Sequence, residues 1–174
     1  STGDPKGVME THANVDFATS SIINYLGNVP DDIVINVLPL SFDYGLYQLL
    51  MSIKFGGTLV LERSFAYPAA ILNRIGEEQV TGLPGVPTLF AMLLQMDLSR
   101  FSLSSLRYLT NTAAALPVAH IQQLRAAFPR ARLYSMYGLT ECKRTLYLPP
   151  EELDRHPGSV GIAIPGTEVW VKDE

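Results

Sequence analysis

Short apolar runs alternate with helical patterns along most of this chain, and no other feature constrains its fold as strongly. We expect strands at the runs rich in β-branched and aliphatic residues, at 32–40, 57–62, 80–86, 106–112 and 132–138. We expect helices where Leu and Ile recur at spacings of three and four, at 44–55, 68–79, 87–96 and 117–128. The strand starts lie roughly 25 residues apart, which is the length of a strand, a helix and two short connections.

This alternation indicates an α/β fold, a parallel sheet of about five βα units with helices on both faces. The runs VINVL and TLVL are apolar at consecutive positions, as in strands that are buried on both faces. A further helix is expected at 11–27, with Thr11 as its N-cap and Gly27 near its end. The segment EVWVKD at 168–173 is expected to add another strand.

The composition indicates one globular domain and excludes several classes of partner and site. A chain of 174 residues with 47% hydrophobic residues is long and apolar enough for one core. The net charge of −4 and the scattered Lys and Arg residues provide no basic surface for nucleic acid. The His residues lie too far apart for a zinc site, and no apolar run is long enough to span a membrane. The single Cys142 excludes an internal disulfide and suits a reducing compartment, so a cytoplasmic location is expected.

Ligands of open α/β sheets bind beyond the carboxyl ends of the strands, which directs attention to the loops that follow them. These loops are 41–45, 84–87, 111–116 and 137–141. The last one, YGLTE, combines an aromatic ring, a glycine, a hydroxyl and a carboxylate in consecutive positions. We therefore expect this loop to belong to a binding site.

The first residues of the chain, STGDPKG, have the chemistry of an anion-binding loop. Ser1 and Thr2 carry hydroxyls, Gly3 and Gly7 let the backbone approach a ligand, and Lys6 supplies a cation. The loop is not a P-loop, because its lysine precedes the glycine and no Ser or Thr starts a helix after it. Taken alone, an ordinary polar turn is the simpler interpretation.

Together, STGDPKG and YGLTE resemble the adenylate-forming superfamily, which includes acyl-CoA synthetases, adenylation domains of nonribosomal peptide synthetases, and luciferases. Further stretches resemble elements of these enzymes in the same order, namely LPLSFDYGL, FGGTLVLE, VTGLPGVPTLF, LRYLTNTAAALP and PGSVGIAIPGTEV. The resemblance covers nearly the whole chain and implies that residues 1–174 are a single α/β subdomain of the large N-terminal domain of such an enzyme. The chain would then begin inside the phosphate loop at 1–7 and end before the ribose-binding region and the C-terminal lid domain.

The resemblance implies an ATP-dependent acid–thiol ligase of the AMP-forming type. A parent enzyme of this kind uses ATP and Mg²⁺ to convert a carboxylic acid to an acyl-adenylate and pyrophosphate. It then transfers the acyl group to the thiol of CoA, or to the phosphopantetheine of an acyl or peptidyl carrier protein. The alternative from another class is a nucleotide-binding or structural fragment without turnover, because the lid with its catalytic lysine is expected to be missing.

The matched motifs imply roles for individual residues. Thr140 would hydrogen-bond the α-phosphate, Glu141 would hold Mg²⁺, and Lys6 would neutralise the outer phosphates, so these three are the expected catalytic residues. The residues expected to bind ATP are Ser1, Thr2, Gly3, Lys6, Gly7, Ala113, Ala114, Ala115, Tyr137, Gly138 and Thr140.

The chain departs from the family pattern in the segment beside the adenine. Ala113 and Ala114 stand where adjacent glycines are usual. Alanine allows a close approach of the backbone but disfavours positive φ, so we expect the local geometry to differ there.

A second departure concerns the substrate. Phe42 stands where many acyl-CoA synthetases have His, and with Asp43 it resembles the Phe-Asp pair of amino-acid-activating domains, in which the Asp binds the ammonium group. Tyr44-Gly45 instead matches the acyl-CoA synthetases, and Asp43 could also cap the next helix, so an amino acid and a plain fatty or aryl acid both stay open. The residues expected to line the acid pocket are Phe42, Asp43, Leu46, Val86 and Asn111.

Overall fold

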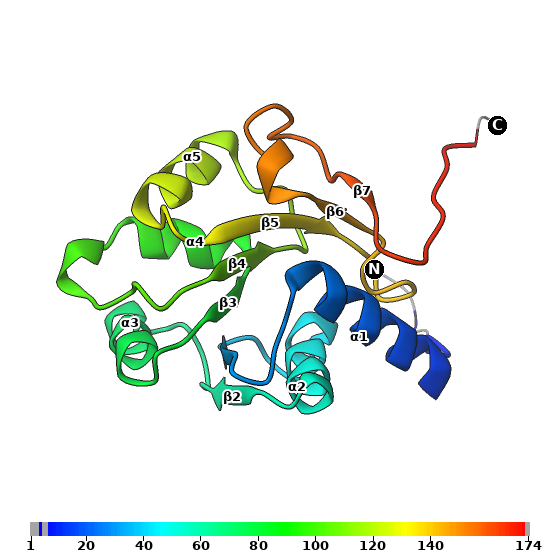
Figure 1. Ribbon diagram of the computed structural model, residues 1–174, viewed down its shortest axis with the longest axis horizontal. Helices are drawn as coiled ribbons and strands as arrows, with labels where there is room; N and C mark the ends of the chain where they lie inside the picture. Colours follow the sequence, from blue (N-terminus) through cyan, green and yellow to red (C-terminus); the bar gives the residue numbers. More distant parts are fainter. Residues whose placement is uncertain (1–3, 5–6, 173–174) are drawn as a thin grey trace.

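A computed structural model of the chain describes residue 4 and residues 7–172. At its centre is a seven-stranded sheet with the strand order β2-β1-β3-β4-β5-β6-β7 (Figure 1). The strands are β1 (Ile33–Asn36), β2 (Thr58–Leu61), β3 (Gly82–Gly85), β4 (Tyr108–Asn111), β5 (Arg132–Tyr137), β6 (Leu146–Leu148) and β7 (Ile162–Ala163). Strands β1 to β5 pair in parallel, whereas β6 pairs antiparallel with both β5 and β7. The α/β fold class is therefore confirmed, but the sheet is mixed rather than parallel throughout.

Helices α2 to α5 connect the five parallel strands in turn, as the sequence pattern predicts. The described helices are α1 (His12–Leu26), α2 (Asp43–Phe55), α3 (Pro68–Glu77), α4 (Pro87–Leu94) and α5 (Val118–Ala127), with the short 3₁₀ helices η1 (Leu98–Arg100) and η2 (Pro150–Glu152). None of these helices has both the length and the hydropathy that a membrane span requires.

Helix α1 begins and ends at the residues that the sequence indicates. The Thr11 hydroxyl accepts a hydrogen bond from the backbone N–H of Asn14 at 3.1 Å, and the Asn14 side chain accepts one from the backbone N–H of Thr11 at 3.0 Å. This reciprocal capping satisfies two amides that a helix start leaves without partners. Gly27 ends the helix with a φ of 63°, in the left-handed conformation that glycine favours.

The two faces of the sheet carry different cores. Helices α3, α4 and α5 pack on one face through a mainly aliphatic core, while α1 and α2 pack on the other through a core rich in tyrosine. Alternation along a strand produces this division, because successive side chains point to opposite faces. On β4, for example, Tyr108 joins the tyrosine-rich core and Leu109 joins the aliphatic one.

The C-terminal end of the chain differs from the sequence-based expectation. The strand expected at 168–173 is wrong over residues 168–172, which belong to no strand and extend away from the sheet (Figure 1). An alternating apolar pattern becomes a strand only beside a partner, and the described residues offer none here, so Trp170 is 75% exposed. The short strands β6 and β7 were not predicted, because so few residues show no clear period of two.

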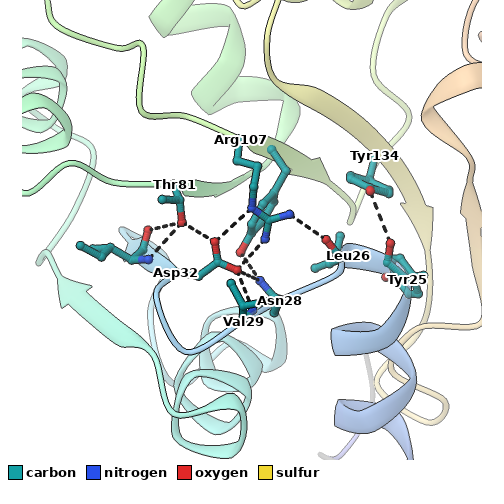
Figure 2. A network of polar contacts seen from close by, with 10 residues as sticks. Tyr25, Leu26, Asn28, Val29, Asp32, Thr81, Arg107 and Tyr134 are labelled. Atoms are coloured by element: carbon teal, nitrogen blue, oxygen red, sulfur yellow. Dashed lines mark hydrogen bonds and ion pairs between the residues drawn. The ribbon is translucent and has the colours of Figure 1, made fainter.

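A polar network joins the amino-terminal ends of three parallel strands around the buried carboxylate of Asp32 (Figure 2). Arg107 donates to its two oxygens from Nη2 at 2.5 Å and from Nε at 3.1 Å, and the Thr81 hydroxyl donates at 2.8 Å. The Asn28 side chain and the Val29 backbone N–H each donate at 3.0 Å. Burial alone raises the pKa of the Asp32 carboxyl, but these hydrogen bonds, with that of Arg107 the largest, outweigh it and hold the pKa below its ordinary value.

Candidate functional site

Two adjoining cavities lie beyond the carboxyl ends of β4 and β5. Cavity A has a volume of about 340 Å³ and is lined by residues 112–116, 135–139 and 157–160. Cavity B has a volume of about 280 Å³ and is lined by residues 42–44, 112–113, 138–141 and 144. Four residues line both cavities, namely Thr112, Ala113, Gly138 and Leu139. Groups bound in the two cavities would therefore lie side by side.

The loop after β4 corrects one expectation from the sequence. Ala113 adopts a φ of 73°, so the expectation that alanine would not take a positive φ at this position is wrong. This conformation costs an L-residue about 1–2 kcal/mol. The side chain of Asn111 helps to hold the turn, since its Nδ2 donates to the carbonyl of Ala114 at 3.0 Å. Ala113, Ala114 and Ala115 are exposed and line cavity A.

The loop after β5 is a tight turn that depends on Gly138. A Cβ atom on Gly138 would overlap the backbone carbonyl of Lys143, so no other residue fits without movement of the loop. Lys143 has a φ of 54°, and Thr145 donates its backbone N–H to the carbonyl of Tyr137 at 2.9 Å, which closes the turn. Tyr137 is the last residue of β5 and lines cavity A with its side chain partly exposed.

The same loop presents a hydroxyl and a carboxylate to cavity B, from the exposed residues Thr140 and Glu141. In residues 4 and 7–172, no three His, Cys, Asp or Glu side chains gather into a metal site. Glu141 could therefore hold Mg²⁺ only together with oxygens of a bound ligand, which is how Mg²⁺ is commonly held beside phosphates. The donors present thus fit a magnesium ion that arrives with a nucleotide.

The remaining residues assigned to phosphate binding lie at the start of the chain. Ser1, Thr2, Gly3 and Lys6 lie outside the described residues, and their assignment stays a prediction. Gly7 is described and is exposed to solvent.

The structure brings only part of the expected acid pocket to cavity B. Phe42 and Asp43 line the cavity, and Asp43 also starts α2, where its Oδ1 accepts the backbone N–H of Tyr44 at 2.8 Å. Leu46 lies one turn further along α2 and is 37% exposed, outside the lining of the cavity. Val86 and Asn111 also lie outside it, Val86 packed between the two cores and Asn111 buried beneath the 111–114 turn.

Arg144 lines cavity B, and the sequence analysis missed it. Its side chain is 6% exposed, and its guanidinium lies over the ring of Tyr44, 4.3 Å from the ring centroid. Burial raises the pKa of Tyr44 to about 12, and the charge of Arg144 and a hydrogen bond with Thr110 offset this only in part. The phenol therefore stays neutral, and the guanidinium of Arg144 stacks on its ring. In the sequence, Arg144 is one of several basic residues in polar surroundings, and only its place three positions after Glu141 could have singled it out.

A further cavity, of about 530 Å³, lies at the amino-terminal ends of β4 and β5. It is lined by residues between 98 and 106 and by residues 127–131, of which only Leu106, the first residue of LRYLTNTAAALP, belongs to a matched stretch. The chemistry-bearing residues gather at the other end of the sheet, in cavities A and B.

Comparison with known proteins decides the family. The family model for AMP-binding enzymes matches residues 1–174, the full length of the chain. The chain belongs to the AMP-binding enzyme family. The resemblance drawn from STGDPKG, YGLTE and the intervening stretches is thereby confirmed.

Two curated relatives show the range within the family. The chain is 30% identical to the mitochondrial malonate–CoA ligase ACSF3 of Mus musculus, over 99% of this chain and 32% of the relative. It is 31% identical to surfactin synthase subunit 1 of Bacillus subtilis, over 99% of this chain and 5% of that much longer protein. The chain thus spans about a third or less of the length of these relatives.

Solved structures of the family superimpose closely. VinN is 40% identical, with a TM-score of 0.89, and the match covers 100% of this chain and 43% of VinN. VinN has also been solved in complex with L-aspartate and with 3-methylaspartate. The o-succinylbenzoate CoA synthetase of Bacillus subtilis, solved with ATP and magnesium, is 29% identical with a TM-score of 0.90, covering 99% of this chain and 36% of that enzyme.

Proposed function

We propose that this chain forms the nucleotide- and acid-binding part of an AMP-forming ligase that activates a carboxylic acid with ATP. The observation that carries the proposal is the shared wall of cavities A and B. Adenylation requires the carboxylate of the acid to attack the α-phosphorus of ATP while pyrophosphate leaves. Two pockets that share Thr112, Ala113, Gly138 and Leu139 would hold these two reactants in contact.

In this proposal the nucleotide base occupies cavity A, beside Tyr137 and the backbone of the 113–115 turn. The phosphates extend toward Thr140, whose hydroxyl donates to the α-phosphate, and toward Glu141, which holds Mg²⁺. The metal ion would supply positive charge where the phosphate oxygens gain negative charge. Support for both ligands comes from the o-succinylbenzoate CoA synthetase structure, which contains ATP and magnesium.

We propose that the acid carries an ammonium group. Asp43 lines cavity B, so its carboxylate is placed to accept an ammonium, and VinN, which is 40% identical, binds L-aspartate. A plain acid remains the second candidate, because acyl-CoA ligases are among the relatives. The small volume of cavity B, about 280 Å³, and its charged wall favour the amino acid over a long acyl chain.

The acyl acceptor is a thiol, of CoA or of the phosphopantetheine on a carrier protein. The relatives named above include both a CoA ligase and a peptide synthetase. Because the chain spans at most about a third of these relatives, we assign turnover to a longer chain and only ligand binding to these residues. The cytoplasmic location expected from the sequence stays a prediction.

Exchange of radiolabelled pyrophosphate into ATP tests the proposed function. The assay uses the longest natural chain that carries these residues, with a panel of amino acids and plain carboxylic acids. Glu141→Gln should lower acid-dependent exchange by about 100-fold or more, because it removes charge at the site where the phosphates react. Its melting temperature should be unchanged, since Glu141 is exposed.

The matched control is Glu151→Gln, the same change at an exposed glutamate of η2. It should leave exchange unaltered. Equal exchange rates in the wild type and Glu141→Gln would refute the role given to this loop, and no exchange with any acid would refute the proposed function.

A further inference from the structure

Arg144 is the one basic residue that is buried in the described part of the chain, and its side chain has no acceptor there. It is 6% exposed, and its Nε is shielded from solvent without a hydrogen-bond partner. No ion pair joins it to a carboxylate among the described residues. Burying an unpaired cation opposes folding, so its presence points to a partner that is not part of this chain.

The guanidinium is positioned to meet that partner in cavity B. The ring of Tyr44 lies beneath it, with 4.3 Å between the guanidinium carbon and the ring centroid. Such stacking occupies the face of the guanidinium and leaves its N–H groups, which point outward in the guanidinium plane, free to donate. Arg144 belongs to the lining of cavity B together with Asp43 and Thr140, and also to that of a neighbouring cavity of about 260 Å³ beside Glu10 and Tyr47, so its side chain borders the space proposed for the acid.

The neighbouring Lys143 is also largely shielded from solvent, but its charge is paired within the chain. The side chain of Lys143 is 11% exposed, and its Nζ lies 3.4 Å from a carboxylate oxygen of Glu10. The same Nζ lies 5.2 Å from the centroid of the Tyr47 ring. Lys143 is therefore neutralised within the chain, whereas Arg144 is not.

We propose that Arg144 binds a second carboxylate of the acid substrate, which makes the substrate an amino dicarboxylic acid. This proposal rests on the proposed function, because it concerns the acid-binding cavity of the same site. The ammonium group of the substrate faces Asp43, and the carboxylate that reacts lies at the wall shared with cavity A. The other carboxylate accepts paired hydrogen bonds from Arg144, the geometry for which a guanidinium is suited.

Charge balance supports this assignment over a monocarboxylic acid. Asp43 and Arg144 both line cavity B but form no ion pair with each other in the described structure. A ligand with one cationic and one anionic group would pair both of them at once. A monocarboxylic amino acid would leave Arg144 buried without a partner, since its single carboxylate is needed at the shared wall.

The test compares acids that differ in the second carboxylate alone. Pyrophosphate exchange is measured with the longest natural chain that carries these residues, using L-aspartate against L-asparagine and L-glutamate against L-glutamine. The wild type should prefer one of the two dicarboxylates over its amide by about 100-fold in kcat/KM, because the amide leaves the buried arginine unpaired. Arg144→Met should remove this preference and leave the KM for ATP unchanged, while Arg144→Lys should retain part of it.

The control is Arg125→Met, the same change at an exposed arginine that pairs with Asp154 on the surface. It should preserve the preference. Three results would each overturn the inference: equal use of acid and amide by the wild type, a retained preference in Arg144→Met, or a raised KM for ATP in Arg144→Met, which would place a nucleotide phosphate on Arg144.

Calorimetric titration with L-aspartate and L-glutamate separates this inference from the proposed function. Tight binding of either acid to the wild type, lost in Arg144→Met, would uphold the second-carboxylate site even if no exchange occurred. Exchange with monocarboxylic acids alone would uphold the ligase and refute the role of Arg144.

Discussion

The two buried charged residues of the described chain lie at opposite ends of the sheet and differ in what surrounds them. Asp32, at the amino-terminal ends of the parallel strands, accepts hydrogen bonds from Arg107, Thr81, Asn28 and Val29 (Figure 2). Arg144, beyond the carboxyl end of β5, lies over an aromatic ring without an acceptor for its N–H groups.

This difference in hydrogen-bond partners indicates that the amino-terminal end of the sheet serves stability and the carboxyl end serves binding. Around Asp32, the chain itself supplies donors to both carboxylate oxygens, although Oδ1 of Asn28 has no partner among the described residues. Removing the carboxylate therefore leaves several donors unpaired. Around Arg144, the described chain supplies no acceptor for the guanidinium. Removing the cation should therefore cost little folding stability and should weaken only the binding of the ligand. Positive φ does not follow this division, since Ala113 and Lys143 have it beside cavities A and B and Gln79 has it just before β3, at the amino-terminal end.

The largest expected effect on stability follows from breaking the network at the amino-terminal end. Asp32→Ala should lower the free energy of unfolding by about 3 kcal/mol, because it leaves the charge of Arg107 without its carboxylate and removes the acceptor of its Nε and Nη2. The estimate lies at the low end for buried pairs, since the side chain of Arg107 is 36% exposed. Urea unfolding followed by circular dichroism measures the change. Asp31→Ala, the same change at the exposed neighbour, should alter it by less than about 0.5 kcal/mol, and equal losses would contradict the account.

The pH dependence of the free energy of unfolding should show the contribution of the Asp32 charge directly. The pKa of Asp32 is lower in the folded than in the unfolded chain, so its stabilisation is complete above the unfolded value of about 3.9 and is lost as pH falls through the folded pKa. The gap in unfolding free energy between the wild type and Asp32→Asn should therefore be constant near neutral pH and shrink below about pH 4. Urea midpoints at a series of pH values test this. A gap that widens in acid would show that the pKa of Asp32 is raised on folding, not lowered.

The smallest expected effect is at the strained residue beside the cavities. Ala113→Gly should stabilise the chain by about 0.5 kcal/mol, because relief of the positive φ slightly exceeds the entropy that glycine adds to the unfolded chain. Ala115→Gly, two positions along in the same loop, should instead destabilise, since its φ is not positive. Thermal unfolding of the two variants compares them. The same sign for both would mean that Ala113 is not strained.

The sequence predicted much of the fold because the relevant patterns are local. Five parallel strands and five helices appear where apolar runs and helical spacings place them. Each strand is shorter than expected, most of all the first, Ile33–Asn36 against the expected 32–40. The two antiparallel strands were missed because they depend on pairing with β5, a contact between distant segments. The strand expected at 168–173 failed over residues 168–172 for the same reason, since a partner strand cannot be read from local alternation.

The sequence predicted the site residues that belong to motifs, but it did not predict those whose role depends on burial in the folded chain. Tyr137, Gly138, Thr140 and Glu141 line the cavities as the YGLTE loop indicates. Arg144 was missed because a sequence does not reveal that an arginine in polar surroundings is buried against a tyrosine.

The nucleotide site in cavity A is tested by a titration of the 174-residue chain with ATP and Mg²⁺, followed through its backbone amide signals by NMR. Shifts should concentrate at residues 111–115 and 137–141, at the carboxyl end of the sheet. Signals around Asp32 and Arg107, at the other end, should stay in place. Shifts at the amino-terminal end, or none at millimolar ATP, would contradict a nucleotide site in cavity A.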